Sequence, residues 1–159
     1  MMDRVNRILF HPQYQHHFQR IQGLEGDREF CGHTMEHFLA VARLSFIMVG
    51  EAGLKVDKEV IYAAALLHDI GRGVEVSTGI PHHESSVIIA RELLGECGFD
   101  EAEEEVIIQT IREHRTLSGG DDFPAIFYRA DKLSRNCFEC SVEGECNWPN
   151  EKKNMKVIL

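Results

Sequence analysis

Apolar residues recur at three- and four-residue steps along most of the chain, which is the period of an α-helix with one buried face. The longest such segment spans about residues 33–49. Its apolar and small face consists of Phe38, Val41, Ala42, Ser45, Phe46 and Val49. No alternating pattern typical of a half-buried strand survives beside it. The sequence therefore predicts an all-α fold, a single-domain helical bundle of about six helices.

Start and stop signals place the other predicted helices. Residues 3–21 form a first helical segment that Pro12 interrupts, so we expect a break or two short helices there. Asp57, Asp100 and Asp122 are N-cap residues, and Asp100 with Glu103 makes an acidic capping box. The predicted helices that follow are 58–69, Pro81–Leu94, 101–115 and 123–133.

Two stretches between these helices read as loops. Residues 71–79 are rich in glycine and poor in helix formers, and residues 117–122 lack an apolar period. The chain after Cys140 combines Gly, Pro, Asn and charged residues, so we assign it no regular structure. We divide the chain into one domain, residues 1–136, and a cysteine-containing C-terminal tail, residues 137–159.

The net charge of the chain limits the kinds of molecule that it is expected to bind. The chain has 159 residues and a formal net charge of −9, with acidic residues concentrated at 101–105. This balance argues against binding a nucleic acid polymer, which requires a basic stripe. A small anionic substrate stays open, because a bound metal reverses the local sign of charge.

The expected compartment is the cytoplasm. The N-terminal residues Asp3, Arg4 and Arg7 are followed by no apolar signal core, and no window is apolar enough to span a membrane. We therefore expect no membrane partner, and we expect the five cysteines to be reduced or bound to metal. The oligomeric state leaves no signal in the sequence.

The most informative stretch is the apolar run 63–72, which ends in adjacent His68 and Asp69 before Gly71. Burying this pair at a helix end is costly unless another charge compensates the lost hydration. A divalent metal is a natural candidate, because imidazole and carboxylate together bind hard and borderline cations. An ion-paired or hydrogen-bonded His–Asp pair is the simpler alternative.

Three further histidines and an aspartate also lie next to predicted core positions. Among nine histidines, His37, His82 and His114 fall in the first turns or at the ends of separate predicted helices, next to core positions. Asp131 lies amid apolar residues of the last helix. Taken singly, each is explained by a satisfied core histidine, a helix-dipole contact or a salt bridge.

Taken together, the order His37, His68-Asp69 and Asp131 resembles the H…HD…D signature of the HD-domain metal-dependent phosphohydrolase superfamily. The resemblance covers roughly residues 33–135. Three local contexts carry it, namely His37-Phe-Leu-Ala-Val41-Ala42, Leu67-His68-Asp69-Ile70-Gly71-Arg72 and Arg129-Ala130-Asp131-Lys132-Leu133.

The resemblance implies that His37, His68, Asp69 and Asp131 coordinate one divalent metal. Members with two metals add two histidines, for which His82 and His114 are the matching positions, and Asp69 would then bridge. Two alternatives stay open. His83 competes with His82, and His33 is either a ligand in place of His37 or a residue that faces substrate.

The implied cofactor is one or two divalent transition-metal ions, Mn, Fe, Co, Ni or Zn, with Mg less expected among so many imidazoles. Such an ion lowers the pKa of bound water from about 15.7 to roughly 7. The expected catalytic residues are His68 and Asp69 at the metal, with Arg72 and Lys132 balancing phosphate charge. Arg43 and Arg115 are further candidates for that task.

The predicted function is hydrolysis of a phosphoester or phosphoanhydride in a small phosphorylated molecule, with a nucleotide as the favoured substrate. Two alternatives come from other classes. One is a di-iron oxygenase built on the same ligands, and the other is a non-catalytic module that binds a metal or a regulatory partner.

A second group of soft ligands follows the last predicted helix. Cys137, Cys140 and Cys146 form a C-x2-C-x5-C pattern, a spacing that can hold zinc or an iron–sulfur cluster. A complete site takes four ligands, and Cys31 or Cys97 could supply the fourth. Reduced thiols in a tail are the alternative.

Overall fold

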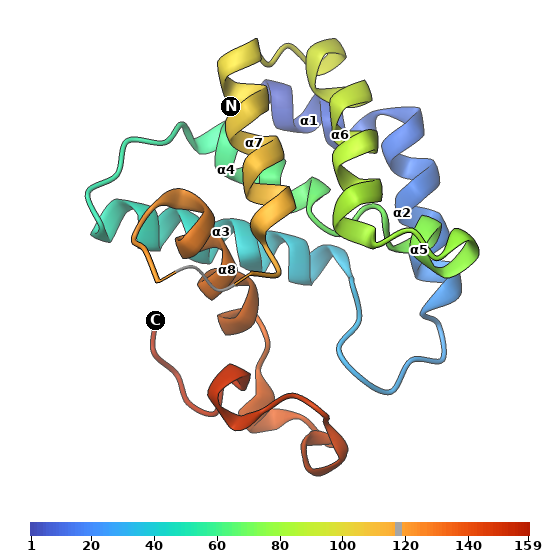
Figure 1. The fold of residues 1–159 in the computed structure, drawn as a ribbon, viewed down its shortest axis with the longest axis vertical. Helices are drawn as coiled ribbons and strands as arrows, with labels where there is room; N and C mark the ends of the chain where they lie inside the picture. Colours follow the sequence, from blue (N-terminus) through green and yellow to red (C-terminus); the bar gives the residue numbers. More distant parts are fainter. Residues whose placement is uncertain (117–118) are drawn as a thin grey trace.

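The computed structural model describes residues 1–116 and 119–159, and within these ranges the fold is all-α (Figure 1). No strand forms there, and no helix is both long and apolar enough to cross a lipid bilayer. The helices are α1 (Asp3–Phe10), α2 (Pro12–Leu24), α3 (Met35–Glu51), α4 (Lys58–Leu67), α5 (Arg72–Thr78), α6 (His82–Cys97), α7 (Glu101–Glu113) and α8 (Phe123–Leu133). Three short 3-10 turns follow, η1 (Cys137–Glu139), η2 (Glu143–Glu145) and η3 (Asn150–Lys152).

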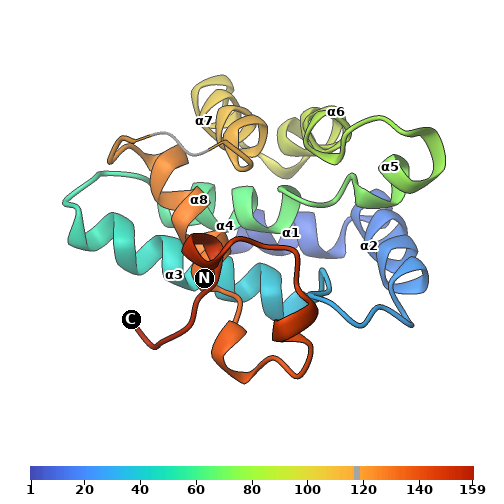
Figure 2. The same cartoon turned by 60° about the horizontal axis from the view of Figure 1, so that its bottom comes forward.

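Helix α4 is the centre of the bundle. All residues from Val60 to Leu67 are buried, so this helix is apolar on every side. It contacts α1, α3, α6 and α7. Figure 2 shows α6 and α7 on one side of α4 and α3 on the other. The end of α4 therefore delivers His68 and Asp69 into the interior between these layers.

The predicted helices form with their predicted start signals. Pro12 separates α1 from α2, and the side chains of Asp57 and Asp122 accept hydrogen bonds from the first turns of α4 and α8. Both hydrogen bonds of the capping box between Asp100 and Glu103 are present. The predicted loop 117–122 lies partly outside the described residues.

The prediction for residues 71–79 is wrong, because most of this stretch forms α5. Low helix propensity is overridden there by contacts with α2 and α6. Gly73 lies against the side chain of Arg20, and a methyl group at Gly73 would come within 3.1 Å of it. With α5 and the division expected at Pro12, the described residues hold eight α-helices in the predicted all-α bundle. The chain after Cys140 also contains two 3-10 turns that the sequence does not indicate.

A close approach between two backbones fixes α4 relative to α6. A Cβ at Gly71 would lie 2.5 Å from the backbone nitrogen of Ser86 and 2.6 Å from the carbonyl oxygen of His82. Only glycine fits this position without displacing α6. The Gly71 amide also donates a 2.9 Å hydrogen bond to Oγ of Ser86. This contact holds the first turn of α6 beside the His68-Asp69 pair.

Candidate metal centre

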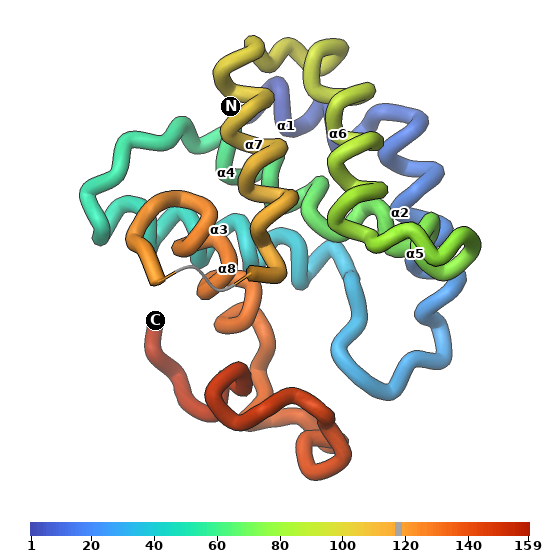
Figure 3. The backbone as a smooth tube through the Cα atoms, viewed as in Figure 1, coloured from blue at the N-terminus to red at the C-terminus, as the bar shows by residue number. Residues whose placement is uncertain are grey.

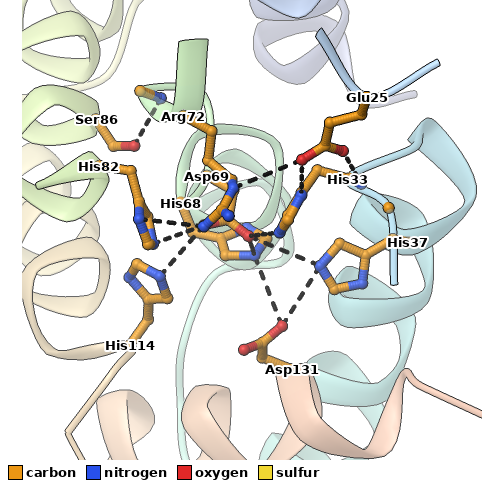
Figure 4. Close-up of polar contacts among 12 residues, drawn as sticks. Glu25, His33, His37, His68, Asp69, Arg72, His82, Ser86, His114 and Asp131 are labelled. Atoms are coloured by element: carbon orange, nitrogen blue, oxygen red, sulfur yellow. Dashed lines mark hydrogen bonds and ion pairs between the residues drawn. The ribbon is translucent and has the colours of Figure 1, made fainter. Parts of the chain in front are cut away.

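The carboxylate of Asp69 lies at the centre of a ring of five imidazoles (Figure 4). Its Oδ2 is 3.1 Å from Nε2 of His68, 3.4 Å from that of His33 and 3.9 Å from that of His37. Its Oδ1 is 3.1 Å from Nε2 of His82 and 3.5 Å from Nε2 of His114. The two oxygens of one carboxylate thus face two different groups of histidines.

Asp131 completes the Oδ2 side. Its Oδ1 lies 3.4 Å from Nε2 of His37 and 3.8 Å from Nε2 of His68. Its other oxygen, Oδ2, accepts a 2.5 Å hydrogen bond from Nζ of Lys132. Asp131 therefore presents one free oxygen to the centre. The six predicted metal-site residues come together here from α3, α6, α8 and the ends of α4 and α7, and each exposes 5 % or less of its surface.

Each imidazole is held by its Nδ1 atom, so its Nε2 atom points inward. His68 and His114 donate to the carbonyl oxygens of Ala65 and Ile111, at 2.8 and 2.5 Å. His37 donates to Oγ of Ser134 at 3.0 Å, and that hydroxyl donates in turn to the carbonyl of Asp131. A carbonyl oxygen can only accept, so Nδ1 carries the proton and Nε2 keeps its lone pair.

Two carboxylates hold the remaining imidazoles in the same way. Oε2 of Glu75, on α5, lies 2.9 Å from Nδ1 of His82. Oε1 of Glu25 lies 2.7 Å from Nδ1 of His33, and the Glu25 carboxylate also accepts the His33 backbone amide at 2.8 Å. Such outer hydrogen bonds orient histidines toward a metal and raise their basicity.

Burial and charge set the protonation of the centre. Burial lowers the pKa of His37 to about 4, so this imidazole is neutral at pH 7. Burial also disfavours the charged form of His68, but Asp69 and Asp131 outweigh it, and the pKa of His68 is raised. Burial raises the pKa of Asp69, yet the surrounding histidines, His68 first, hold that pKa well below its ordinary value. The centre thus contains ionised Asp69 and neutral His37, the protonation states in which these residue types bind metals.

The residues fit divalent metal ions. His37, His68 and Asp69 offer ligand atoms within 4.8 Å of one another, and so do Asp69, His82 and His114. The two groups share Asp69. The Nε2 atoms of His37 and His68 are buried without a hydrogen-bond partner, which is costly unless a cation accepts their lone pairs. One ion on each side of Asp69 would account for both groups.

The distances also bear on the two alternatives that the sequence leaves open. Within the described residues, neither close group of ligand atoms contains His83 or His33. His83 adjoins His82, with ring centroids 6.1 Å apart, whereas Nε2 of His82 contacts Asp69 directly. His33 is near Asp69 but lines the adjoining cavity, unlike His37. The close groups of ligand atoms thus include His82 and His37, while His33 lies 3.4 Å from Asp69 and lines the cavity.

A cavity of about 500 Å³ adjoins the centre. His82, His114, Asp69 and Asp131 form part of its lining, while His37 and His68 do not. The cationic residues of the lining are Arg28, Arg72, Arg115, Lys132, Arg135 and Lys152. Arg43, by contrast, is exposed on α3 and does not line this cavity.

Sequence reasoning missed the residues that orient the imidazoles. Glu25 and Glu75 are separated from their histidines by eight and seven positions. Glu75 lies in the stretch misread as a loop, and Ser134 lies 97 positions from His37. A carboxylate shortly before each of His33 and His82 was the available signal, but only the fold shows that they meet.

The chain belongs to the HD domain family, whose model matches residues 34–136. The HD domain is characteristic of a superfamily of metal-dependent hydrolases. The structure is similar to the crystal structure of a predicted HD superfamily hydrolase from an uncultured Thermotogales bacterium, with a TM-score of 0.61 and 26 % sequence identity. That likeness covers 91 % of this chain and 83 % of the other.

Two related sequences extend the comparison. An uncharacterized protein of Clostridium beijerinckii is 44 % identical over 156 residues, which is 98 % of this chain and 99 % of the relative. Ribonuclease Y of Borreliella burgdorferi is 29 % identical over 126 residues, or 79 % of this chain. That match spans only 23 % of the ribonuclease.

Proposed function

We propose that this protein is a two-metal phosphohydrolase that cleaves a phosphoester or phosphoanhydride bond of a small phosphorylated molecule, with a nucleotide as the substrate class. The observation that carries the proposal is the composition of the main cavity. A chain of net charge −9 concentrates six cationic side chains around a buried histidine–aspartate centre. That reversal of sign is what an anionic substrate requires.

Aromatic residues at the rim favour a nucleotide among phosphorylated molecules. Phe30 and Trp148 line the cavity together with the cations. Nζ of Lys132 lies 5.2 Å from the centroid of the Trp148 ring, so charge and aromatic surface are adjacent. A base can stack on an aromatic ring while basic side chains bind its phosphate.

The protein's own residues have distinct tasks in this proposal. Divalent ions at the centre would supply an activated water at neutral pH. Asp69 and the imidazoles hold the ions in place, and His33 faces the cavity beside Asp69. Arg72 lies between the two orienting carboxylates, 3.7 Å from Glu25 and 3.8 Å from Glu75, with its guanidinium in the cavity lining. It is thus held ready to bind a phosphate oxygen.

Phosphate release from a panel of nucleoside mono-, di- and triphosphates tests the proposal, with and without a chelator. We expect chelator-sensitive turnover of one class of small nucleotide. Because part of ribonuclease Y is similar to this chain, the panel should also include a short oligoribonucleotide. Fully metal-loaded protein that hydrolyses none of these would contradict the proposal, and oxygen-dependent turnover without phosphate release would indicate an oxygenase.

A further inference from the structure

Four of the five cysteines line one or both of two cavities that share Cys31, outside the histidine centre. Cys31 lies in the 25–34 loop, and the others lie in the segment after α8, at the same end of the molecule (Figure 3). Cys31, Cys137 and Cys140 line one cavity of about 370 Å³, and Cys31 and Cys146 line the main cavity. Cys97 lines neither, because it is buried on α6. The fold thus selects Cys31 over Cys97 as the fourth member of the group.

The backbone of the C-terminal segment presents its thiols in tight turns. Cys137 begins η1, and the Cys140 amide donates to the Cys137 carbonyl at 3.2 Å. Cys146 directly follows η2, and its amide donates to the carbonyl of Glu143 at 3.1 Å. A C-x2-C turn of this kind presents two thiolates to one metal centre.

The segment is tied back to the helical bundle at several points. Nδ2 of Asn154 donates to the carbonyl of Leu133 at 2.9 Å, at the end of α8. Nη1 of Arg135 donates to the carbonyl of Gly32 at 2.5 Å, which joins the segment to the loop that carries Cys31. These contacts hold the 25–34 loop and the C-terminal segment beside each other. A metal bound by thiols of both segments would link them further.

Cys31 is the one cysteine of the group that lines both cavities. Burial raises the pKa of Cys31, the Arg135 guanidinium opposes this, and the thiols of Cys137, Cys140 and Cys146 raise that pKa further. Thiolates brought together around one point repel one another unless a cation binds them. All five cysteines are free, so no disulfide competes for these sulfur atoms.

We propose that Cys31, Cys137, Cys140 and Cys146 bind a second metal centre through four thiolates, and that this centre fastens the 25–34 loop to the C-terminal segment. Zinc and an iron–sulfur cluster share this ligand chemistry. Among the described residues, the groups with three ligand atoms within 4.8 Å are the two histidine–aspartate groups. Binding therefore draws the thiols closer together, which two irregular segments permit. The inference does not depend on the proposed hydrolytic reaction.

Metal and sulfide analysis of the full chain, purified without oxygen, tests the proposal. We expect one zinc ion, or an iron–sulfur cluster with visible absorption, beyond the metal at the histidines. Cys31→Ser and Cys140→Ser should each lose this metal and keep the histidine-bound ions. Cys97→Ser is the matched control and should retain both. Equal metal content in all four proteins would overturn the proposal.

A second measurement uses wild-type protein alone, so it tests the proposal even if the cysteine variants fail to fold. Trp148 is the only tryptophan of the chain and lies two residues after Cys146, so its fluorescence reports on this segment. Adding zinc, or reconstituting a cluster, on metal-free wild-type protein should change that fluorescence and protect the four cysteines from alkylation. Wild-type protein that binds neither zinc nor a cluster at these thiols would also overturn the proposal.

Discussion

The two sides of Asp69 are built differently. On the Oδ2 side, His37, His68 and Asp131 join Asp69 and make a set of four protein ligands. On the Oδ1 side, only His82 and His114 join it. The two histidines of the first set, His37 and His68, do not line the main cavity, whereas both histidines of the second set do.

This difference assigns different tasks to the two positions. A site with four protein ligands holds its ion firmly and leaves little room for other ligands. A site with three keeps positions free for water and substrate, which is typical of catalytic metals. We therefore expect a tightly bound ion on the Oδ2 side and a more exchangeable ion, next to the substrate, on the Oδ1 side.

Asp69→Ala should have the largest effect, because it removes the one residue that both sides share. We expect loss of both ions and of hydrolysis below detection, measured by metal analysis and phosphate release. Asp121→Ala is a suitable control, since Asp121 is exposed and, within residues 1–116 and 119–159, forms its ion pair with Arg129. An Asp69→Ala protein with two ions and an unchanged rate would refute the bridging role.

His82→Ala should break one side only. We expect the variant to keep one ion per chain and to lose turnover, because the position beside the substrate would be empty. His83→Ala tests the neighbouring histidine on the same turn and should keep both ions and the wild-type rate. If His83→Ala loses the ion and His82→Ala does not, the two assignments must be exchanged.

Glu75→Gln should weaken the Oδ1 side without emptying it. Loss of an orienting carboxylate costs about 10- to 100-fold in metal affinity or activity, and Glu75 orients only His82. Glu25→Gln is the matched comparison, because Glu25 orients His33, which we place at the cavity wall. We expect a raised KM from Glu25→Gln with unchanged metal affinity. Titrations of each variant with Mn²⁺ measure the difference.

Lowering the pH should weaken metal binding on the Oδ2 side gradually, and by less than the substitutions above. Metal binding requires neutral imidazole, and the raised pKa of His68 means that this ring takes up a proton at a pH above its ordinary 6.5. Affinity should therefore fall as the pH decreases through the pKa of His68, by up to about tenfold per pH unit. His37, with a pKa of about 4, should contribute only in stronger acid. Calorimetry in buffers of different ionisation enthalpy counts the protons released.

The sequence predicts the framework of this molecule better than its details. Proline, N-cap aspartates and apolar periodicity act locally, so α1 to α4 and α6 to α8 are readable from them. Helix α5 is not, because its stability comes from α2, α6 and the packing of Gly73 on Arg20. Tertiary contacts that override propensity leave no local pattern.

The candidate site shows the same division. The fold brings the six residues predicted for the metal site to one place. Their roles as ligands stay a prediction. The orienting residues Glu25, Glu75 and Ser134 could not be predicted, because only the fold shows which histidine each of them contacts. The gathering of Cys31 with the C-terminal cysteines likewise depends on a loop path that only the structure shows.

Anomalous diffraction from crystals grown with Mn²⁺ tests the central claim most directly. Two peaks should appear on opposite sides of the Asp69 carboxylate, the stronger beside His37, His68 and Asp131 and the weaker beside His82 and His114. Crystals saturated with Mn²⁺ that show no metal between Asp69 and these imidazoles would contradict the account.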